Sequence, residues 1–313
     1  LDLFGPTAVV HRHPMRDRLS EDITRLLDSQ GVRTLRGTGR LVGPHRVAVD
    51  HGGRTEEIEV DAVLLATGSR GRVPEWAVID GERVLSTRDA YPPPEIPEHL
   101  VVVGSGVTGV EFTHMFSALG SRVTLVVSRQ QVLPSKDAEV AAVLEEEFLR
   151  RGVELLKGAR ASGVVRDGDR VTVACEDGRS VAGSHVLLCV GSVPNSEGLG
   201  CEAAGVEVSP SGHVPGNRHC QTNVPHIYAA GDLSGRLPLS SVATAQGRSV
   251  AEHVMGLTTV EHRHLDYDKA AQAVFTDPEI AEVGVAEAEA FAAGAKMRVT
   301  KVPFSANARA LIN

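Results

Sequence analysis

The sequence predicts an α/β fold built from two copies of one unit, and an internal repeat is the first observation behind this prediction. Residues 31–69, GVRTLRGTGRLVGPHRVAVDHGGRTEEIEVDAVLLATGS, share a skeleton with residues 152–192, GVELLKGARASGVVRDGDRVTVACEDGRSVAGSHVLLCVGS. Both segments begin with Gly-Val, continue through Arg-Val-x-Val and a Gly-Arg turn, and end in Val-Leu-Leu followed by Gly-Ser. A skeleton that recurs at this spacing indicates a duplicated structural unit.

Each copy follows a segment whose apolar residues recur at helical spacing. These positions are Leu19, Ile23, Leu26 and Leu27 before the first copy, and Val140, Val143, Leu144 and Phe148 before the second. We therefore expect helices over about residues 18–30 and 137–151, each ended by a glycine. Each unit is then a helix, a short strand, a β-excursion with a turn, and an apolar strand.

A glycine-rich loop before the second copy predicts that this unit binds a dinucleotide. The stretch VVVGSGVTGVEF, residues 101–112, is an apolar strand that runs into a turn and then a helix extending to about Leu119. In a Rossmann-like unit, the first glycine permits a tight turn, the second lets a pyrophosphate approach, and the third lets helix and strand pack closely. The helix N-terminus then favours the phosphates, the alternative being a purely structural turn. The residues expected at the nucleotide are Gly104, Ser105, Gly106, Val107, Thr108 and Gly109.

The end of the next strand, residues 123–127, bears on which nicotinamide cofactor is preferred. A site for NAD carries a carboxylate there that binds the ribose 2′-hydroxyl. This chain reads LVVSRQQ, with Ser128 and Arg129 and no acid. Serine and arginine can bind a 2′-phosphate, which a carboxylate would repel. We therefore expect NADP(H) to be favoured, with tolerance of NAD(H) as one alternative and a solvated surface charge at Arg129 as another.

A second strand end predicts a further ligand contact. The segment TNVPHIYAAGD, residues 222–232, is an apolar strand that ends in Gly231 and Asp232, and a helix over about residues 240–255 follows. An aspartate in this position can bond a sugar-like hydroxyl, and the helix N-terminus can face a polar ring edge.

Together these motifs resemble the pyridine nucleotide-disulfide oxidoreductases, a family of FAD enzymes that includes dihydrolipoamide dehydrogenase. The segments that carry the resemblance are LLATGS (64–69), VVVGSGVTGVEF (101–112), CVGSVPN (189–195), TNVPHIYAAGD (222–232) and AVFTDPEIAEVG (273–284). The resemblance implies two Rossmann-like domains of three-layer ββα type, with the NAD(P) domain inserted into the FAD domain. It implies an FAD-binding segment at 1–92, the NAD(P)-binding domain at 93–215, a second FAD-binding segment at 216–264, and the start of an α+β dimerisation domain at 265–313.

The resemblance also implies which residues lie at each cofactor. Those implied at FAD are Gly39, Thr67, Gly68, Ser69, Gly231, Asp232, Leu239, Ser240 and Ser241. Gly191 would lie near NAD(P), and Glu111 would be the catalytic residue beside the nicotinamide. The alternative for Glu111, placed by the sequence in the first helical turn, is a favourable charge at the helix N-terminus.

Within this family, three segments look most like the actinobacterial NAD(P)H quinone reductases: STRDAYPPPEIPEHLVVVGSGVTGVEF, VVSRQQVLPSKDAEV and GRLPLSSVA. Two departures count against a dihydrolipoamide dehydrogenase: LSS at 239–241 where lipoamide enzymes usually carry LAH, and Ser128 in place of an NAD-selecting glutamate. The expected activity is hydride transfer from NAD(P)H to FAD and on to a quinone. The alternatives are a dihydrolipoamide dehydrogenase or related disulfide reductase, and a nucleotide-binding module without turnover.

Both ends of the chain look like cuts through a longer protein. We expect the loop for the FAD phosphates and any redox CxxxxC pair to lie upstream of Leu1. Most of the dimerisation domain, with its His-Glu pair, is expected beyond Asn313.

Composition narrows the remaining classes. The 313 residues carry a net charge of −8 and no Lys/Arg block, so nucleic acid is not an expected partner. No apolar run approaches the roughly 20 residues of a membrane span. The four cysteines are Cys175, Cys189, Cys201 and Cys220, and their spacing is not that of metal ligands. We therefore expect reduced thiols, no bound metal and a cytoplasmic location. We expect a homodimer that reduces a small-molecule acceptor, a quinone or a disulfide.

Overall fold

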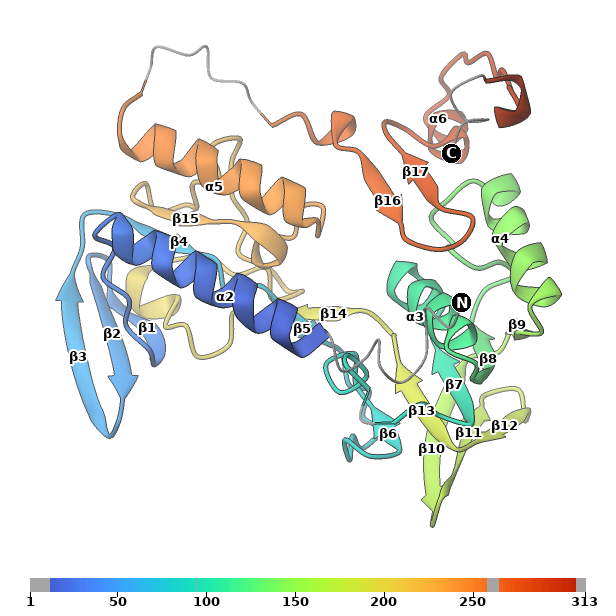
Figure 1. Cartoon of the computed structure of the whole chain (residues 1–313). Helices are drawn as coiled ribbons and strands as arrows, with labels where there is room; N and C mark the ends of the chain where they lie inside the picture. The colour runs from blue at the N-terminus through green and yellow to red at the C-terminus, as the bar shows by residue number, and fades with distance from the viewer. Residues whose placement is uncertain (1–11, 94, 258–264, 308–313) are drawn as a thin grey trace.

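The computed structural model describes residues 12–93, 95–257 and 265–307. Some residues of the predicted domains lie outside the described residues. They are 1–11 and 258–264 of the two predicted FAD-binding segments, 94 of the predicted NAD(P)-binding domain, and 308–313 of the predicted dimerisation domain. The elements of the first copy gather with β15 and α5 at one end of the molecule, and a parallel sheet with α3 and α4 forms the other (Figure 1). The predicted α/β class is confirmed.

The second copy belongs to a five-stranded parallel sheet with the order β6-β13-β7-β8-β9. Its strands are β6 (Val84–Leu85), β7 (His99–Val103), β8 (Arg122–Val127), β9 (Glu154–Lys157) and β13 (His185–Leu188). Every residue of β7 and β13 is buried, as expected for strands covered on both faces. Side chains alternate between the faces because successive residues of a strand point to opposite sides.

Two separate cores show that this unit has three layers. On one face, Leu100 and Val102 pack with residues of α3 (Val107–Ala118) and α4 (Ala138–Arg150). On the other face, Val101 and Val103 pack against an antiparallel sheet of β10 (Ala161–Asp167), β11 (Arg170–Cys175) and β12 (Ser180–Gly183). This arrangement is the predicted ββα layering.

The first copy repeats the same excursion. Its antiparallel strands are β1 (Thr38–Gly43), β2 (Arg46–His51) and β3 (Arg54–Glu59), and the apolar strand that follows is β4 (Val63–Leu65). β4 pairs in parallel with β15 (Ile227–Ala229), and the helices of this end are α2 (Arg12–Ser29) and α5 (Ser240–Val254). The duplication is therefore visible in the structure.

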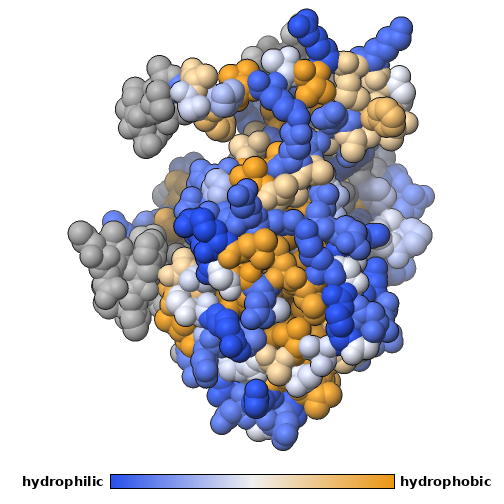
Figure 2. All heavy atoms as spheres, turned by 90° about the vertical axis from the view of Figure 1, so that its right-hand side faces the viewer, coloured by the Kyte–Doolittle hydropathy of each residue, from blue (hydrophilic) through white to orange (hydrophobic). Residues whose placement is uncertain are grey.

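Three local predictions need correction. The apolar positions predicted for the first helix, Leu19, Ile23, Leu26 and Leu27, are all exposed on α2. The short strand expected at the start of the first copy is absent from residues 32–36, and no strand of the described chain pairs with them, whereas its counterpart β9 bonds to β8. On α4 the buried residues are Ala141, Leu144 and Phe148, and the predicted positions Val140 and Val143 are exposed. Figure 2, which looks at the side of the molecule that carries α4, shows hydrophobic side chains among hydrophilic ones.

Two short strands carry the chain between the two ends of the molecule. β5 (Ser69–Gly71) and β14 (Ser192–Pro194) pair antiparallel, with Ser69 opposite Pro194 and Ser192 opposite Gly71, so the segments that close the two copies run side by side in opposite directions. The domain boundaries stay predictions. However, β6 precedes the expected boundary at 92 and already pairs with β13.

The remaining elements lie on the helical side of the parallel sheet (Figure 1). They are β16 (Gln272–Val274), β17 (Ile280–Glu282) and α6 (Glu287–Ala292). Val274 and Ile280 join the core formed with α3 and α4. The 3₁₀ helices are η1 (Glu202–Ala204), η2 (Gly231–Ser234), η3 (Tyr267–Lys269) and η4 (Phe304–Ala306). Among the described residues, no helix is both long enough and apolar enough to cross a membrane.

The turn before β6 is fixed by Asp80, and this predicts a pH dependence of stability. Asp80 Oδ1 accepts from the backbone N–H groups of Glu82, Arg83 and Val84, each at 2.8 Å, and Oδ2 bonds Arg166 at 2.8 Å. Burial alone would raise the pKa of Asp80, but these donors lower it from 3.8 to about 2. The ionised carboxylate therefore stabilises the native state above pH about 4, and this contribution is lost as the pH falls from about 4 towards 2.

Asp80→Asn is expected to lower the thermal midpoint at neutral pH and to approach the parent protein only near pH about 2, where Asp80 becomes protonated in the native state as well. The measurement is the difference in midpoint between the two proteins from pH about 6 to about 2. A difference that stays constant over this range would contradict the assignment.

Candidate functional site

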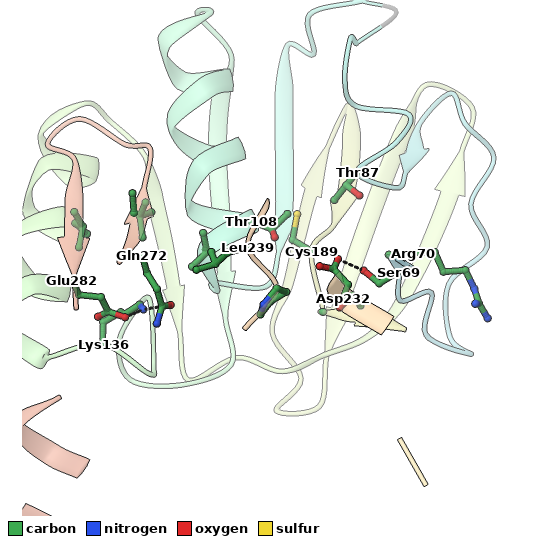
Figure 3. Close-up of a pocket in the computed structure, with 18 residues that line it drawn as sticks. Ser69, Arg70, Thr87, Thr108, Lys136, Cys189, Asp232, Leu239, Gln272 and Glu282 are labelled. Atoms are coloured by element: carbon green, nitrogen blue, oxygen red, sulfur yellow. Dashed lines mark hydrogen bonds and ion pairs between the residues drawn. The ribbon is translucent and has the colours of Figure 1, made fainter. Parts of the chain in front are cut away.

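A cavity of about 400 Å³ lies where four parts of the chain meet. Ser69 and Asp232 lie on one side of it, Lys136, Gln272 and Glu282 on the other, and Thr108, Leu239 and Cys189 between them (Figure 3). The walls come from β5, the glycine-rich loop, the segment before α5, and β16 with β17.

Ser69 and Asp232 meet on one side of this cavity although 163 positions separate them in the chain. Ser69 Oγ donates to Asp232 Oδ2 at 2.7 Å (Figure 3). The pairing follows from the fold, because β4 and β15 are parallel neighbours and their carboxyl ends lie at the same edge. The Asp232 carboxylate can accept a further bond from a ligand hydroxyl.

Thr67 and Gly68 are held by the motif that closes the second copy. Thr67 Oγ1 donates to the Asn195 carbonyl at 2.8 Å, and the Asn195 side chain donates to the Thr67 carbonyl at 2.9 Å. The Asn195 backbone N–H donates to the Gly68 carbonyl at 3.0 Å. The structure therefore brings together LLATGS and CVGSVPN, two of the segments that carried the resemblance.

A buried glutamine that the sequence analysis missed fixes the turn at Gly231. Gly231 has φ +68°, and its N–H donates to Gln246 Oε1 at 2.7 Å. Gln246 is 0% exposed, and its amide also donates to the Tyr267 hydroxyl at 3.0 Å. Its position between Val242 and Val250, both buried at four-residue spacing, is the sequence signal that could have found it.

The helix after this turn begins beside the cavity. Leu239 caps α5 in an extended conformation without a side-chain cap and lines the cavity. Ser240 and Ser241 form the exposed start of the helix, so the N-terminal N–H groups are suited to a polar ring edge. Gly39 lies exposed on β1 and lines neither of the two cavities at the loop. The roles of these four residues remain predictions.

The glycine-rich loop has the geometry that its three glycines predict. Gly104 has φ +109°, and a Cβ on it would overlap the Cys189 carbonyl oxygen. A Cβ on Gly109 would overlap the Gly104 carbonyl oxygen, because α3 packs closely on β7. Above Gly106 there is open space, and this residue begins α3 without a side-chain cap. The loop therefore leaves a cradle at Gly106 that fits a pyrophosphate.

Of the other predicted loop residues, one is buried and two line the central cavity. Ser105 is buried and its carbonyl accepts from Leu133 N at 2.8 Å. Val107 and Thr108 are exposed on the first turn of α3 and line the central cavity.

A second cavity, of about 510 Å³, lies on the other side of the loop. Ser128 and Gly191 line it, whereas the predicted Arg129 is not among the lining residues. Three charged residues that sequence reasoning missed do line it: Arg72, Arg160 and Glu176. No local pattern marks them, because Arg72 follows β5, and Arg160 and Glu176 border strands of the second excursion, all distant in sequence from the loop.

Cys189 lines both cavities beneath the loop. It follows β13 directly, and burial raises the pKa of its thiol to about 12. Cys189 is therefore a neutral packing residue rather than a nucleophile. All four cysteines are free and buried. No cluster of three or more His, Cys, Asp or Glu side chains in the described part of the chain could hold a metal ion.

Glu111 does not lie in the first turn of α3, so the helix-terminus interpretation is wrong: α3 begins at Val107. Its Oε1 instead accepts from the backbone N–H of Phe275 at 2.9 Å, just past β16. The carboxylate thus joins α3 to the segment that bounds the central cavity. Its role beside a nicotinamide stays a prediction.

Lys136 was also missed. Its side chain is 7% exposed and lies in the central cavity, where the ammonium donates to Gln272 Oε1 at 3.2 Å and pairs with the Glu282 carboxylate (Figure 3). Nothing in VLPSKD distinguishes this lysine from a solvated one, because both partners come from β16 and β17.

Two nucleotide-type units, a shared cavity and the appended strands define the class: the chain belongs to the pyridine nucleotide-disulphide oxidoreductases. The sequence model of this family matches residues 6–247, and that of its dimerisation domain matches residues 270–313. The resemblance found in the sequence is confirmed, and membership implies a flavin and a nicotinamide cofactor.

Among individual proteins, the chain is 44% identical over 300 residues to the NAD(P)H dehydrogenase (quinone) of Mycobacterium tuberculosis, covering 93% of this chain and 60% of that protein. It is 33% identical to a dihydrolipoyl dehydrogenase of Bacillus subtilis, covering 94% of this chain and 64% of the relative. The crystal structure of LpdA from M. tuberculosis superposes with a TM-score of 0.91 at 42% identity, covering 98% of this chain and 68% of that one. The chain thus spans under two thirds of the length of these curated relatives.

Proposed function

We propose that the protein is an FAD-dependent NAD(P)H oxidoreductase that passes electrons to a quinone. The observation that carries the proposal is the central cavity, where Ser69, Asp232 and Leu239 of the implied flavin site face Val107 and Thr108 of the dinucleotide loop. Such an arrangement would let a flavin and a nicotinamide ring come into contact, which is the main requirement for hydride transfer.

The residues present fit both cofactors. The open cradle at Gly106 and the free start of α3 suit a pyrophosphate, and the carboxylate of Asp232 suits a ribityl hydroxyl. The bound cofactors supply the redox chemistry, hydride transfer from nicotinamide to flavin. The chain binds and orients them, and Val107, Leu239 and Val274 give the cavity walls an apolar character that limits water.

The identity of the acceptor rests on the relatives and on the flavin edge. The M. tuberculosis relative is named a quinone dehydrogenase, and LSS at 239–241 departs from the lipoamide pattern. A dihydrolipoamide dehydrogenase or related disulfide reductase is the second candidate, favoured by the 33% identity to the B. subtilis relative. Ser128 in the second cavity supports NADP(H). The dimerisation-domain match supports a homodimer, and the four free thiols support the cytoplasm.

The test is optical. Purified protein should show flavin absorption that bleaches under NADPH without oxygen and recovers on addition of a benzoquinone, but not of lipoamide. Recovery with lipoamide alone would favour the disulfide reductase. A colourless protein that binds NADPH would indicate a nucleotide-binding module.

Asp232→Ala is expected to lower flavin affinity roughly tenfold, because hydrogen bonds to a charged group contribute about 1.5–3 kcal/mol. The measurement is fluorescence titration of the apoprotein with FAD. Glu197→Ala is the matched control, since this exposed carboxylate pairs with Arg70 beside the site and lines neither cavity at the loop. Equal affinities for the two variants would contradict the role of Asp232.

A further inference from the structure

We propose that Arg160 and Glu176 together set the preference between NADP(H) and NAD(H), with Arg160 binding the 2′-phosphate and Glu176 opposing it. This inference rests on the proposed function, because it assigns the second cavity to the adenosine end of the nicotinamide cofactor. It moves the discriminating cation from Arg129, at the strand end, to an arginine on the β-excursion.

The backbone places Arg160 beside the end of β8. Gly158 N donates to the Arg129 carbonyl at 2.9 Å, and Ala159 N donates to the Val127 carbonyl at 3.0 Å. The next residue, Arg160, therefore emerges next to Ser128, and both line the cavity that contains Gly104 and Gly106. Since a dinucleotide bound to a Rossmann-like unit lies across the carboxyl ends of its strands, this end of the cavity would take the adenosine ribose.

Glu176 lies opposite Arg160 in the same cavity. Its backbone N–H donates to the Arg160 carbonyl at 2.9 Å, which fixes the two residues as neighbours across the excursion. The carboxylate approaches the guanidinium only to 3.9 Å, and the two side chains are 59% and 62% exposed. An ion pair this long and this exposed contributes little, so Arg160 can exchange its partner for a ligand phosphate.

The two side chains act on the 2′ position with opposite signs. A guanidinium presents paired donors that match a phosphate, whereas a carboxylate repels it and accepts a hydrogen bond from a 2′-hydroxyl. A site for NAD requires an acid, and the end of β8 has none. In this protein Glu176, in the turn after β11, supplies it. A pair of this kind is expected to admit both cofactors, with the arginine giving NADP(H) the advantage.

The experiment uses two probes that lack the nicotinamide, 2′,5′-ADP and 5′-AMP, titrated calorimetrically into protein saturated with FAD. The probes differ only in the 2′-phosphate. Arg160→Ala is expected to weaken 2′,5′-ADP binding at least tenfold and to leave 5′-AMP within about twofold, as loss of one phosphate contact would. Glu176→Gln is expected to strengthen 2′,5′-ADP binding about threefold.

Arg129→Ala is the matched control and should change neither affinity by more than about twofold. Loss of 2′,5′-ADP binding in Arg129→Ala but not in Arg160→Ala would overturn this assignment alone. An unchanged affinity in Glu176→Gln would overturn the opposing role of the carboxylate. Failure of 2′,5′-ADP alone to bind the unaltered protein would overturn this assignment, whereas failure of both probes would also overturn the nicotinamide site of the proposed function.

Discussion

Gly109→Ala is expected to destabilise the parallel-sheet unit by at least about 3 kcal/mol, above the range usual for overpacking. The added Cβ would overlap the carbonyl oxygen of Gly104, a backbone atom that cannot rotate away. Gly104 is itself held, since its N–H donates to the Val126 carbonyl at 3.1 Å. The strain therefore passes directly into β7 and β8. Thermal unfolding followed by circular dichroism should show a midpoint lower by about 10 °C.

Gly106→Ala is the matched control three residues away. Open space lies above Gly106, its φ is −72°, and alanine fits both. The thermal midpoint should stay within about 2 °C of the parent, while binding of 2′,5′-ADP falls because the methyl group occupies the phosphate cradle. A midpoint for Gly109→Ala as high as that of Gly106→Ala would show that helix and strand are not in the contact described.

The contrast between these glycines shows what a sequence can reveal about this site. The turn, the cradle and the helix–strand contact depend on residues within one short loop, so spacing alone predicts them. The duplication was predictable for a similar reason, because the two copies repeat the order of strands that forms each excursion. Even the pairing of Ser69 with Asp232 follows once β4 and β15 are known to be parallel neighbours.

The residues that were missed reach the site through tertiary contacts. Arg160 directly precedes β10 and Glu176 directly follows β11, and their entry into the cavity depends on how this segment is bonded to the end of β8. Gln246 gave a signal, a polar residue in an apolar stripe, whereas Lys136 gave none. The error over Glu111 was one of register: the helix begins at Val107, which leaves the carboxylate a turn too far along to face the N-terminus.

The buried lysine carries the second large prediction. Lys136 follows a loop whose Leu133 N–H donates to the Ser105 carbonyl, so its backbone is tied to the dinucleotide loop. Its ammonium reaches Gln272 on β16 and Glu282 on β17. The pair thus fastens the strands after residue 270 to the nucleotide-binding unit and closes one wall of the central cavity.

Lys136→Met is expected to weaken this attachment by about 2 kcal/mol. Breaking a fully buried pair costs about 3–5 kcal/mol. We expect about 2 kcal/mol here because Glu282 is 33% exposed and can be hydrated when its partner is removed. Amide hydrogens of β16 should then exchange about 30-fold faster, while those of β7 keep their protection.

The double variant Lys136→Met/Glu282→Met separates an ion pair from simple loss of a side chain. Methionine at both positions leaves no charge buried without a partner, so the double variant should lose less than about 1 kcal/mol, with exchange of β16 close to that of the parent. If the two substitutions instead add, Lys136 and Glu282 stabilise the wall of the cavity independently, and the strands are held by the packing of Val274 and Ile280 against α3 and α4.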